Sequence, residues 1–302
     1  MIKKKYEFLI ALNNFCNLSC SYCDKWKGTK YIDKVKFRYL IHQILDLDTQ
    51  YICLWWWEPL LHPHFFELIN ILTYEISKWN HKINLAINTN GLLLTLYLDK
   101  LKSLIEWNPL ISFTLYVSLD GITEIENHKR WLKSNQIKSI IDSMIVLKKQ
   151  NFQNLNIVIS SVLILSDIPW NLFYNSIIFF KNLGIDIHFC FEEIIESNSF
   201  WITPTIEKSL IKRALLLKRL WIHIWFEDVW AMNSLYRIDY NGDIYNMLDS
   251  TFLGSDEFKI SKDYQLIPNI QKNISIVSQD DIFLRTYKDI RYIALIKQFI
   301  SL

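Results

Sequence analysis

The amino-acid sequence predicts an α/β fold, a partial TIM-like (β/α)6 barrel followed by a small C-terminal α+β appendage. Short apolar runs alternate along the chain with segments whose apolar residues recur every three or four positions, the spacing of one helix face. Six such strand-then-helix units in a row indicate a parallel sheet covered by helices. They span roughly 215 residues, whereas a closed barrel has eight units and about 250 residues. The barrel is therefore expected to be open.

Each expected strand is a short run rich in leucine, β-branched or aromatic residues, and the six runs lie at 6–12, 51–54, 83–87, 111–118, 155–165 and 185–191. The expected helices alternate with them, at 37–47, 65–76, 96–105, 137–147, 172–183 and 206–220. In the first helix Leu40, Ile41, Ile44 and Leu47 recur at helical spacing, and we expect them to form its buried face.

The pattern changes after residue 220. Asn241-Gly242 lies between two short segments at 236–240 and 243–247, and this dipeptide is a strong signal for a β-hairpin. We therefore expect a core barrel over residues 1–220 and a small domain over residues 221–302.

Composition and charge exclude several classes of protein. Hydrophobic residues make up 51% of the 302 residues, which is enough for a sizeable core and unlike a disordered chain. The 33 Lys and Arg nearly balance the 31 Asp and Glu, so the charge indicates neither a nucleic-acid nor an anionic-membrane partner. No apolar run is long enough for a secretory signal or a membrane span. We expect a cytoplasmic protein.

Three of the five cysteines, Cys16, Cys20 and Cys23, lie within eight residues directly after the first expected strand. Thiolates suit zinc, copper(I) or an iron–sulfur cluster. A structural zinc site needs four ligands and no second cysteine pair follows, although a zinc knuckle completed by a nearby histidine stays open. A redox pair of two cysteines would leave Cys16 unexplained. Cys53 and Cys190 stand alone in strand-like runs and are expected to be buried, inert thiols.

Together with four later motifs, this loop resembles the radical S-adenosylmethionine (SAM) superfamily. The three cysteines match its CxxxCxΦC pattern, with Tyr22 as the aromatic residue. The other motifs resemble the GGEPL, TNG and SLDG segments and the RG pair of that family, and they lie at 57–60, 88–91, 117–121 and 128–131. The resemblance covers about residues 5–195. It is closest to the SPASM/Twitch-type maturase branch, but no cysteine follows residue 190 to hold an auxiliary cluster.

The resemblance implies a role for each motif residue. Cys16, Cys20 and Cys23 would hold a [4Fe–4S] cluster whose fourth iron binds the amino and carboxylate groups of SAM. The residues expected to bind SAM are Tyr22, Trp56, Trp57, Glu58, Asn90, Ser118 and Arg130. Of these, Arg130 resembles the residue that binds the SAM carboxylate, and the backbone of residues 56–58 would approach the SAM amino group.

The resemblance also implies an activity, radical SAM chemistry. The reduced cluster would cleave SAM to a 5′-deoxyadenosyl radical, which abstracts hydrogen from an unknown substrate for which a peptide is one candidate. A reductant protein would supply the electron. No further catalytic residue is assigned, and His62, His64, Glu192 and Glu193 are expected to be ordinary loop or solvated residues. Two alternatives stay open: a non-catalytic iron–sulfur or zinc binding module, and a degenerate scaffold for a peptide-modification partner.

The tryptophans are anomalous in number and in place. The chain has 12 Trp and only 6 Gly, although glycine averages about 7% of residues. Trp56, Trp57 and Trp131 occupy motif positions where the family carries glycine. Three adjacent indoles at 55–57 could form a stacking platform, but that would not explain Trp131 or the scarcity of glycine. Our hypothesis is that many of these tryptophans correspond to UGA codons that the source organism reads as glycine.

Overall fold

The computed structural model describes residues 6–190, apart from 22, 24–26, 48, 56, 80–81 and 163–167, together with three short strands at 235–238, 243–246 and 252–255. Two expectations lie outside these residues: the sixth helix, at 206–220, and the domain boundary at residue 220, which stays a prediction.

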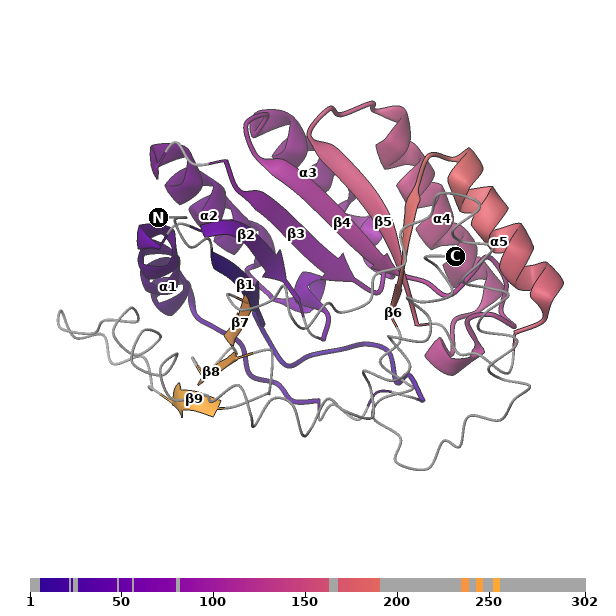
Figure 1. Ribbon diagram of the computed structural model, residues 1–302, viewed down its shortest axis with the longest axis horizontal. Coiled ribbons are helices and arrows are strands. Elements are labelled where there is room, and N and C mark those ends of the chain that lie inside the picture. Colours follow the sequence, from indigo (N-terminus) through magenta and orange to yellow (C-terminus); the bar gives the residue numbers. More distant parts are fainter. Residues whose placement is uncertain are drawn as a thin grey trace, which may run out of the picture.

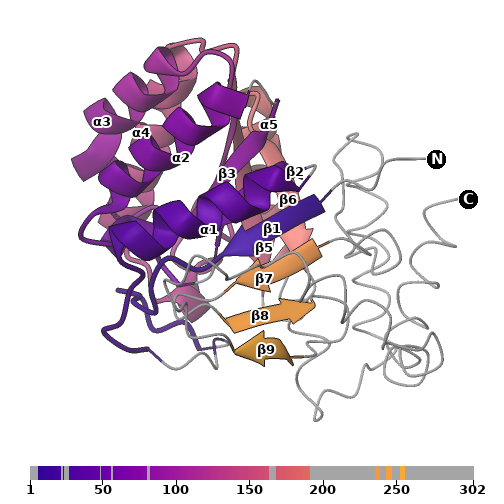
Figure 2. The same cartoon turned by 90° about the vertical axis from the view of Figure 1, so that its left-hand side faces the viewer.

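Six parallel strands form the body of a single sheet and pair in the order in which they occur along the chain (Figure 1). They are β1 (Tyr6–Ile10), β2 (Thr49–Leu54), β3 (Asn84–Thr89), β4 (Ser112–Ser118), β5 (Leu155–Val162) and β6 (Asp186–Cys190). The helices that connect them are α1 (Lys34–Asp46), α2 (Phe65–Trp79), α3 (Leu94–Trp107), α4 (Ser134–Lys149) and α5 (Trp170–Asn182). All five helices lie on one face of the sheet (Figure 2). The predicted parallel α/β fold is confirmed.

The helices α1, α3, α4 and α5 begin two or three residues earlier than their apolar pattern predicts, whereas α2 begins at the predicted residue 65. At α1 the Asp33 carboxylate caps the helix, and it accepts hydrogen bonds from the backbone N–H groups of Val35 and Lys36, both at 2.9 Å. Such a cap satisfies N–H groups that have no partner within the helix. The cap at Asp33 therefore sets the start of α1 at Lys34. This start lies three residues before the first buried side chain of the helix, Phe37.

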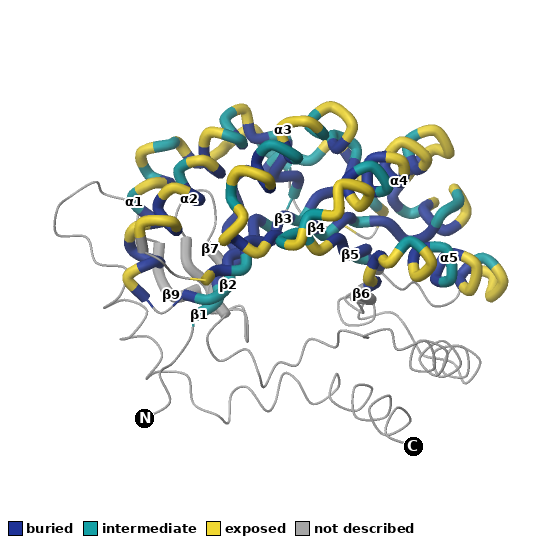
Figure 3. Tube along the Cα trace, turned by 90° about the horizontal axis from the view of Figure 1, so that it is seen from above, coloured by how far each residue is buried: buried dark blue, intermediate teal, exposed yellow. Residues whose placement is uncertain are grey.

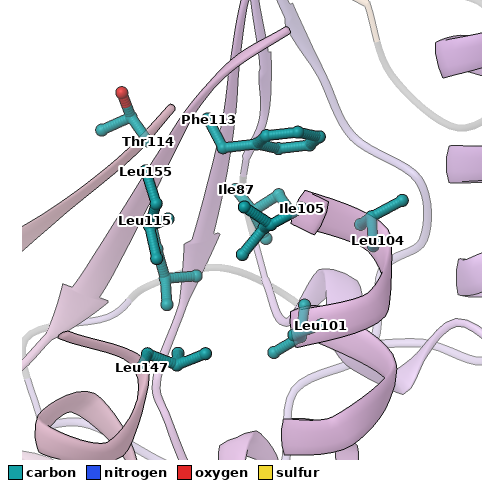
Figure 4. Close-up of a pocket in the computed structure, with 9 residues that line it drawn as sticks. All are labelled: Ile87, Leu101, Leu104, Ile105, Phe113, Thr114, Leu115, Leu147 and Leu155. Carbon is teal, nitrogen blue, oxygen red and sulfur yellow. The ribbon is translucent and has the colours of Figure 1, made fainter. Parts of the chain in front are cut away.

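The main hydrophobic core fills the space between the sheet and the helices. Because side chains alternate across a strand, every second strand residue points into this core, as Phe8, Ile52 and Leu85 do. The surface of the helices that faces away from the sheet is exposed (Figure 3). A small pocket within the core lies between α3, α4 and the sheet (Figure 4). Its lining is apolar except for one threonine, so it is a packing gap; the residues are Ile87, Leu101, Leu104, Ile105, Phe113, Thr114, Leu115, Leu147 and Leu155.

The C-terminal strands extend the same sheet at its β1 edge (Figure 1). β7 (Leu235–Ile238) pairs parallel to β1, and β8 (Asp243–Asn246) and β9 (Phe252–Ser255) follow in antiparallel order. The hairpin predicted around Asn241-Gly242 is confirmed, since Tyr236 pairs with Asn246. None of the helices in the described part combines the length and apolar character that crossing a bilayer requires.

Candidate functional site

Four of the expected motifs follow the carboxyl ends of neighbouring parallel strands. The cysteine loop follows β1, Glu58 follows β2, Asn90 follows β3, and Ser118 is the last residue of β4. Because β1–β4 are adjacent and parallel, these ends meet at one edge of the sheet. We call this edge the rim and define it as residues 13–31, 55–61, 90–93 and 118–131.

Glu58 joins two strand ends of the rim. Its side chain has no exposed surface, and the carboxylate accepts hydrogen bonds from the Asn90 N–H at 2.6 Å, the Thr89 hydroxyl at 2.9 Å and the Leu60 N–H at 3.1 Å. Burial raises the pKa of Glu58 to about 7, although these three hydrogen bonds lower it in part. The residue therefore holds the β2 and β3 loops together.

Glu58 also anchors the start of the cysteine loop through its backbone. Its N–H donates to the Phe15 carbonyl at 2.8 Å, and its own carbonyl accepts from the Asn13 side chain at 3.1 Å. The base of the loop is closed where the Asn14 N–H donates to the Lys30 carbonyl at 3.0 Å and the Gly28 N–H donates to the Asn14 carbonyl at 2.8 Å. These bonds close the base of the loop that carries Cys16, Cys20 and Cys23.

The three thiols differ in their surroundings. Cys16 is partly buried, its sulfur accepts from the Leu18 N–H at 3.5 Å, and burial raises the pKa of its thiol. Cys20 is also partly buried, while Cys23 is exposed, and the Cys23 N–H donates to the Cys20 carbonyl at 3.1 Å in a tight turn. Within the described residues, no three Cys, His, Asp or Glu side chains are close enough together to hold one metal ion.

Two contacts tie the cysteine loop to the rest of the rim. The Asn90 amide donates to the Asn17 side-chain oxygen at 2.7 Å and lies 3.9 Å from the Cys16 sulfur. On the far side of the loop, the Ser21 N–H donates to the Lys129 carbonyl at 2.8 Å. The loop is thus fixed to the β3 end by a side chain and to the 128–131 segment by the main chain.

The donor set fits a cluster held by three thiolates. Soft sulfur ligands are the chemistry that iron–sulfur clusters require, and all three thiols come from one loop whose base is fixed. Cys53, by contrast, lies within β2 and is buried, and burial raises the pKa of its thiol to about 12. It is no part of this loop, as the sequence predicts.

Arg130 lies in a short 3₁₀ turn (His128–Arg130) and is buried. Its Nε and Nη2 donate to the two carboxylate oxygens of Asp120, at 2.7 and 3.0 Å. The Ser161 hydroxyl also donates to Asp120, at 3.3 Å. This two-pronged ion pair was not foreseen from the sequence, because nothing in the spacing of Asp120 and Arg130 indicates their contact. The role of Arg130 toward SAM stays a prediction.

The other residues that the sequence analysis considered for the site differ in how far the structure describes them. The Ser118 hydroxyl is 3.5 Å from the Asn88 side-chain oxygen, next to the rim. Tyr22 and Trp56, like Glu192 and Glu193, lie outside the described residues. Trp57 is described, and its backbone has a positive φ of 41°.

The two histidines after β2 behave as structural loop residues. His62 is buried, and its Nε2 lies 2.9 Å from the Ile32 carbonyl while its Nδ1 accepts from the His64 N–H at 3.0 Å. Burial lowers the pKa of His62, which favours the neutral ring that this pattern requires. The exposed His64 ring contacts Glu67 at 3.0 Å.

The inner face of the sheet, which points away from the helices, carries a polar cluster that the sequence did not reveal. Tyr51, Cys53 and Tyr116 pack together there against Leu9 and Ala86. Burial raises the pKa of Tyr51, Tyr116 and Cys53, so all three groups hold their protons at neutral pH. Alternation of side chains along β2 and β4 could have indicated a shared face, but not which residues meet across it.

Comparison with known proteins gives matches over the part of the chain that builds this rim. The family model described as "Radical SAM superfamily" matches residues 10–168. A GTP 3′,8-cyclase of Chlorobaculum tepidum is 36% identical over 96 residues, which are 30% of this chain and 28% of that protein. The chain thus aligns with less than a third of that curated relative.

Solved structures show the same fold at low sequence identity. The enzyme anSMEcpe with bound AdoMet superposes with a TM-score of 0.65 and 19% identity, over 90% of this chain and 82% of that one. SuiB of Streptococcus suis bound to S-adenosylmethionine gives a TM-score of 0.56 and 14% identity, over 80% of this chain and 60% of that one. SuiB bound to its precursor peptide SuiA gives a TM-score of 0.57 and 14% identity, over 85% and 64% of the two chains.

Proposed function

The chain belongs to the radical SAM superfamily, whose enzymes use a [4Fe–4S] cluster and SAM, and we propose that its cysteine loop is the cluster site. Cys16, Cys20 and Cys23 would be the thiolate ligands. A cluster held by these three residues would supply the electron for reductive cleavage of bound SAM, and the radical so produced would abstract hydrogen from the substrate.

One observation above all supports this assignment: the Asn90 side chain reaches across the rim to the cysteine loop, 3.9 Å from the Cys16 sulfur. A loop that only connected β1 to α1 would need no such tie to the end of β3. Because Glu58 fixes the backbone of Asn90 at 2.6 Å, the position of the thiol is linked to the sheet through two residues. Precise placement of a reactive group requires support of this kind.

We assign the SAM contacts to the same rim. The backbone of residues 57–58, the Ser118 hydroxyl and the Asn90 amide lie at adjacent strand ends, where polar groups can meet the amino acid part of SAM. We expect the backbone of Trp56 to take part in the same contact. Arg130 is the candidate for its carboxylate, and Asp120 orients the guanidinium by two hydrogen bonds. Tyr22 would lie beside the adenine.

We further propose that the substrate lies along the inner face of the sheet. The Tyr51 and Tyr116 phenols are half-buried there and would act as hydrogen-bond donors to the substrate. A peptide is the favoured substrate class, since anSMEcpe and SuiB are both solved with peptides. The cyclase match spans too little of either chain for its nucleotide substrate to be carried over. A reductant protein would deliver the electron, and the need for a reduced cluster favours a cytoplasmic setting.

Iron and sulfide analysis of anaerobically prepared protein tests the assignment. We expect about four irons per chain, and Cys20→Ala should lose nearly all of them. Cys53→Ala is the matched control, because Cys53 is buried in β2, and it should keep its iron.

The same preparations separate the alternatives. Zinc in place of iron would support a zinc-binding module. Iron without formation of 5′-deoxyadenosine from SAM and a chemical reductant would support an inert cluster or a scaffold for a peptide-modification partner. Full iron content in Cys20→Ala would refute the ligand assignment.

A further inference from the structure

Two tryptophans adopt a backbone conformation that suits glycine. Among the described residues other than glycine, three have positive φ: Trp57 at 41°, Trp131 at 57° and Asn151 at 55°. Asparagine tolerates this left-handed region because its short amide can hydrogen-bond locally, and Asn151 lies directly after the C-cap of α4, where such a residue is common. A bulky side chain in this region is a true outlier.

The conformation at residue 57 is imposed by its neighbours. On one side, the Trp55 N–H donates to the Ile10 carbonyl at 3.1 Å. On the other, the Glu58 N–H donates to the Phe15 carbonyl at 2.8 Å, and the Glu58 side chain is buried. The positive φ at Trp57 therefore lies between two fixed backbone contacts and belongs to the architecture of the rim.

The same holds at residue 131. Trp131 closes the 3₁₀ turn, and its N–H donates to the His128 carbonyl at 3.0 Å. Its neighbours Arg130 and Leu132 are buried, whereas its own side chain is 65% exposed. The indole thus packs too little to explain why this residue adopts a left-handed conformation.

Two of the other described tryptophans also lack the burial typical of this residue. The buried core of the described part contains Phe, Leu and Ile but no Trp, while Trp107 and Trp170 are exposed. Tryptophan is normally among the more buried residues.

We infer that positions 57 and 131 carry glycine in the protein as its source organism makes it, from UGA codons read as glycine. Counting every Trp as Gly would bring glycine to about 6% of the chain, near its usual share of about 7%. Without a side chain at 57, the backbone lies open to close approach by a ligand. That ligand would be the amino group of SAM, a part of the inference that rests on the proposed function.

Mass spectrometry of the protein isolated from its source tests the residue assignment directly. Peptides that cover residues 51–60 and 128–134 should have masses and fragment ions for glycine at 57 and 131. Asn151 is the internal control, because it shares the positive φ and should be found as asparagine. Tryptophan at either position would overturn the inference for that position.

A recombinant series tests the backbone argument independently. Trp57→Gly and Trp131→Gly should each raise Tm by a few degrees relative to the printed sequence. Trp107→Gly, within the last turn of α3, is the matched control and should give no such gain. Equal effects at 57 and 107 would overturn the backbone argument.

Titration of the cluster-loaded chains with SAM separates this inference from the proposed function. We expect Trp57→Gly to bind SAM at least tenfold more tightly than the printed sequence, since the indole no longer blocks the approach. Glycine at 57 by mass spectrometry without SAM binding by that variant would refute the proposed function and leave the residue assignment standing.

Discussion

At position 58, a carboxyl group with no exposed surface accepts hydrogen bonds from three donors on the β2 and β3 loops. Burial opposes ionisation and the hydrogen bonds favour it, and the balance raises the pKa to about 7. Glu58 thus combines a structural role at the rim with a titration near neutral pH.

This titration predicts a pH dependence of stability. The folded-state pKa lies above that of the unfolded chain, so the contribution of Glu58 is present below about pH 4.5 and is lost as pH rises through about 7. The loss is at most about 3 kcal/mol. Urea unfolding between pH 5 and 8 should show a decline in the wild type that is reduced in Glu58→Gln. An identical pH profile in the two proteins would contradict the raised pKa.

The Asp120–Arg130 pair predicts a large cost for removing one partner. Asp120→Asn should lower the free energy of unfolding by about 3–5 kcal/mol, because it leaves a buried guanidinium without its counter-charge. Asp142→Asn is the control, since Asp142 pairs with Lys138 on the exposed surface of α4, and its cost should stay below about 1 kcal/mol. Similar costs for the two variants would show that the Asp120 pair is not buried.

At the scale of elements, the turn from β3 into α3 depends on Gly91. Its φ is +83°, and an added Cβ would lie 2.8 Å from the Ile140 side chain on α4. Gly184, between α5 and β6, has a φ of +63° but an added Cβ there would meet nothing closer than 3.5 Å. The two positions share the backbone conformation and differ in available space.

Substitution of each glycine by alanine should separate the cost of the left-handed backbone from the cost of steric overlap with α4. Gly184→Ala should cost about 1–2 kcal/mol from the left-handed backbone alone. Gly91→Ala should cost about 1–3 kcal/mol more, from overpacking against α4. Thermal or urea denaturation gives both values, and equal costs would mean that α4 moves away without penalty.

Strands and helices were predicted well because the residue pattern that indicates each one lies within its own segment. Apolar runs located the strands because leucine, β-branched and aromatic residues dominate them, and helical spacing located the helices from the side they bury. The first turn of α1 was missed because its cap, Asp33, is polar and precedes the apolar pattern. In the candidate site, the motifs lie directly after or at the end of neighbouring strands, and this brings them together at the rim. The Asp120–Arg130 and Tyr51–Tyr116 pairings depend on how loops and strands come together in space, which residue spacing does not encode.

At the scale of the whole molecule, the β7–β9 strands complete the sheet on the side of β1. The hairpin signal at Asn241-Gly242 is local, whereas the pairing of β7 with β1 joins segments more than 200 residues apart and has no sequence signature. The sequence predicted a separate appendage, whereas the structure joins β7 to the main sheet. As a result β1, which leads into the cysteine loop, has a strand on each side.

Hydrogen exchange can test this arrangement. Arg237→Pro removes a backbone donor from the middle of β7, which pairs with both β1 and β8. Amide exchange should accelerate in β1. It should stay unchanged in β4, which lies three strands from β1 in the sheet. Unchanged exchange in β1 would contradict its pairing with β7.

The graded burial of the three cysteines has a consequence for a chain exposed to air. Cys23 is exposed, whereas Cys16 is partly buried and its raised thiol pKa keeps it protonated. Oxidation requires access to the sulfur, so damage would begin at the exposed Cys23. A preparation handled aerobically would then contain chains with one sulfur oxidised and two intact. Early damage of this kind is repairable, because a first-stage sulfenic acid or disulfide can still be reduced by added thiol.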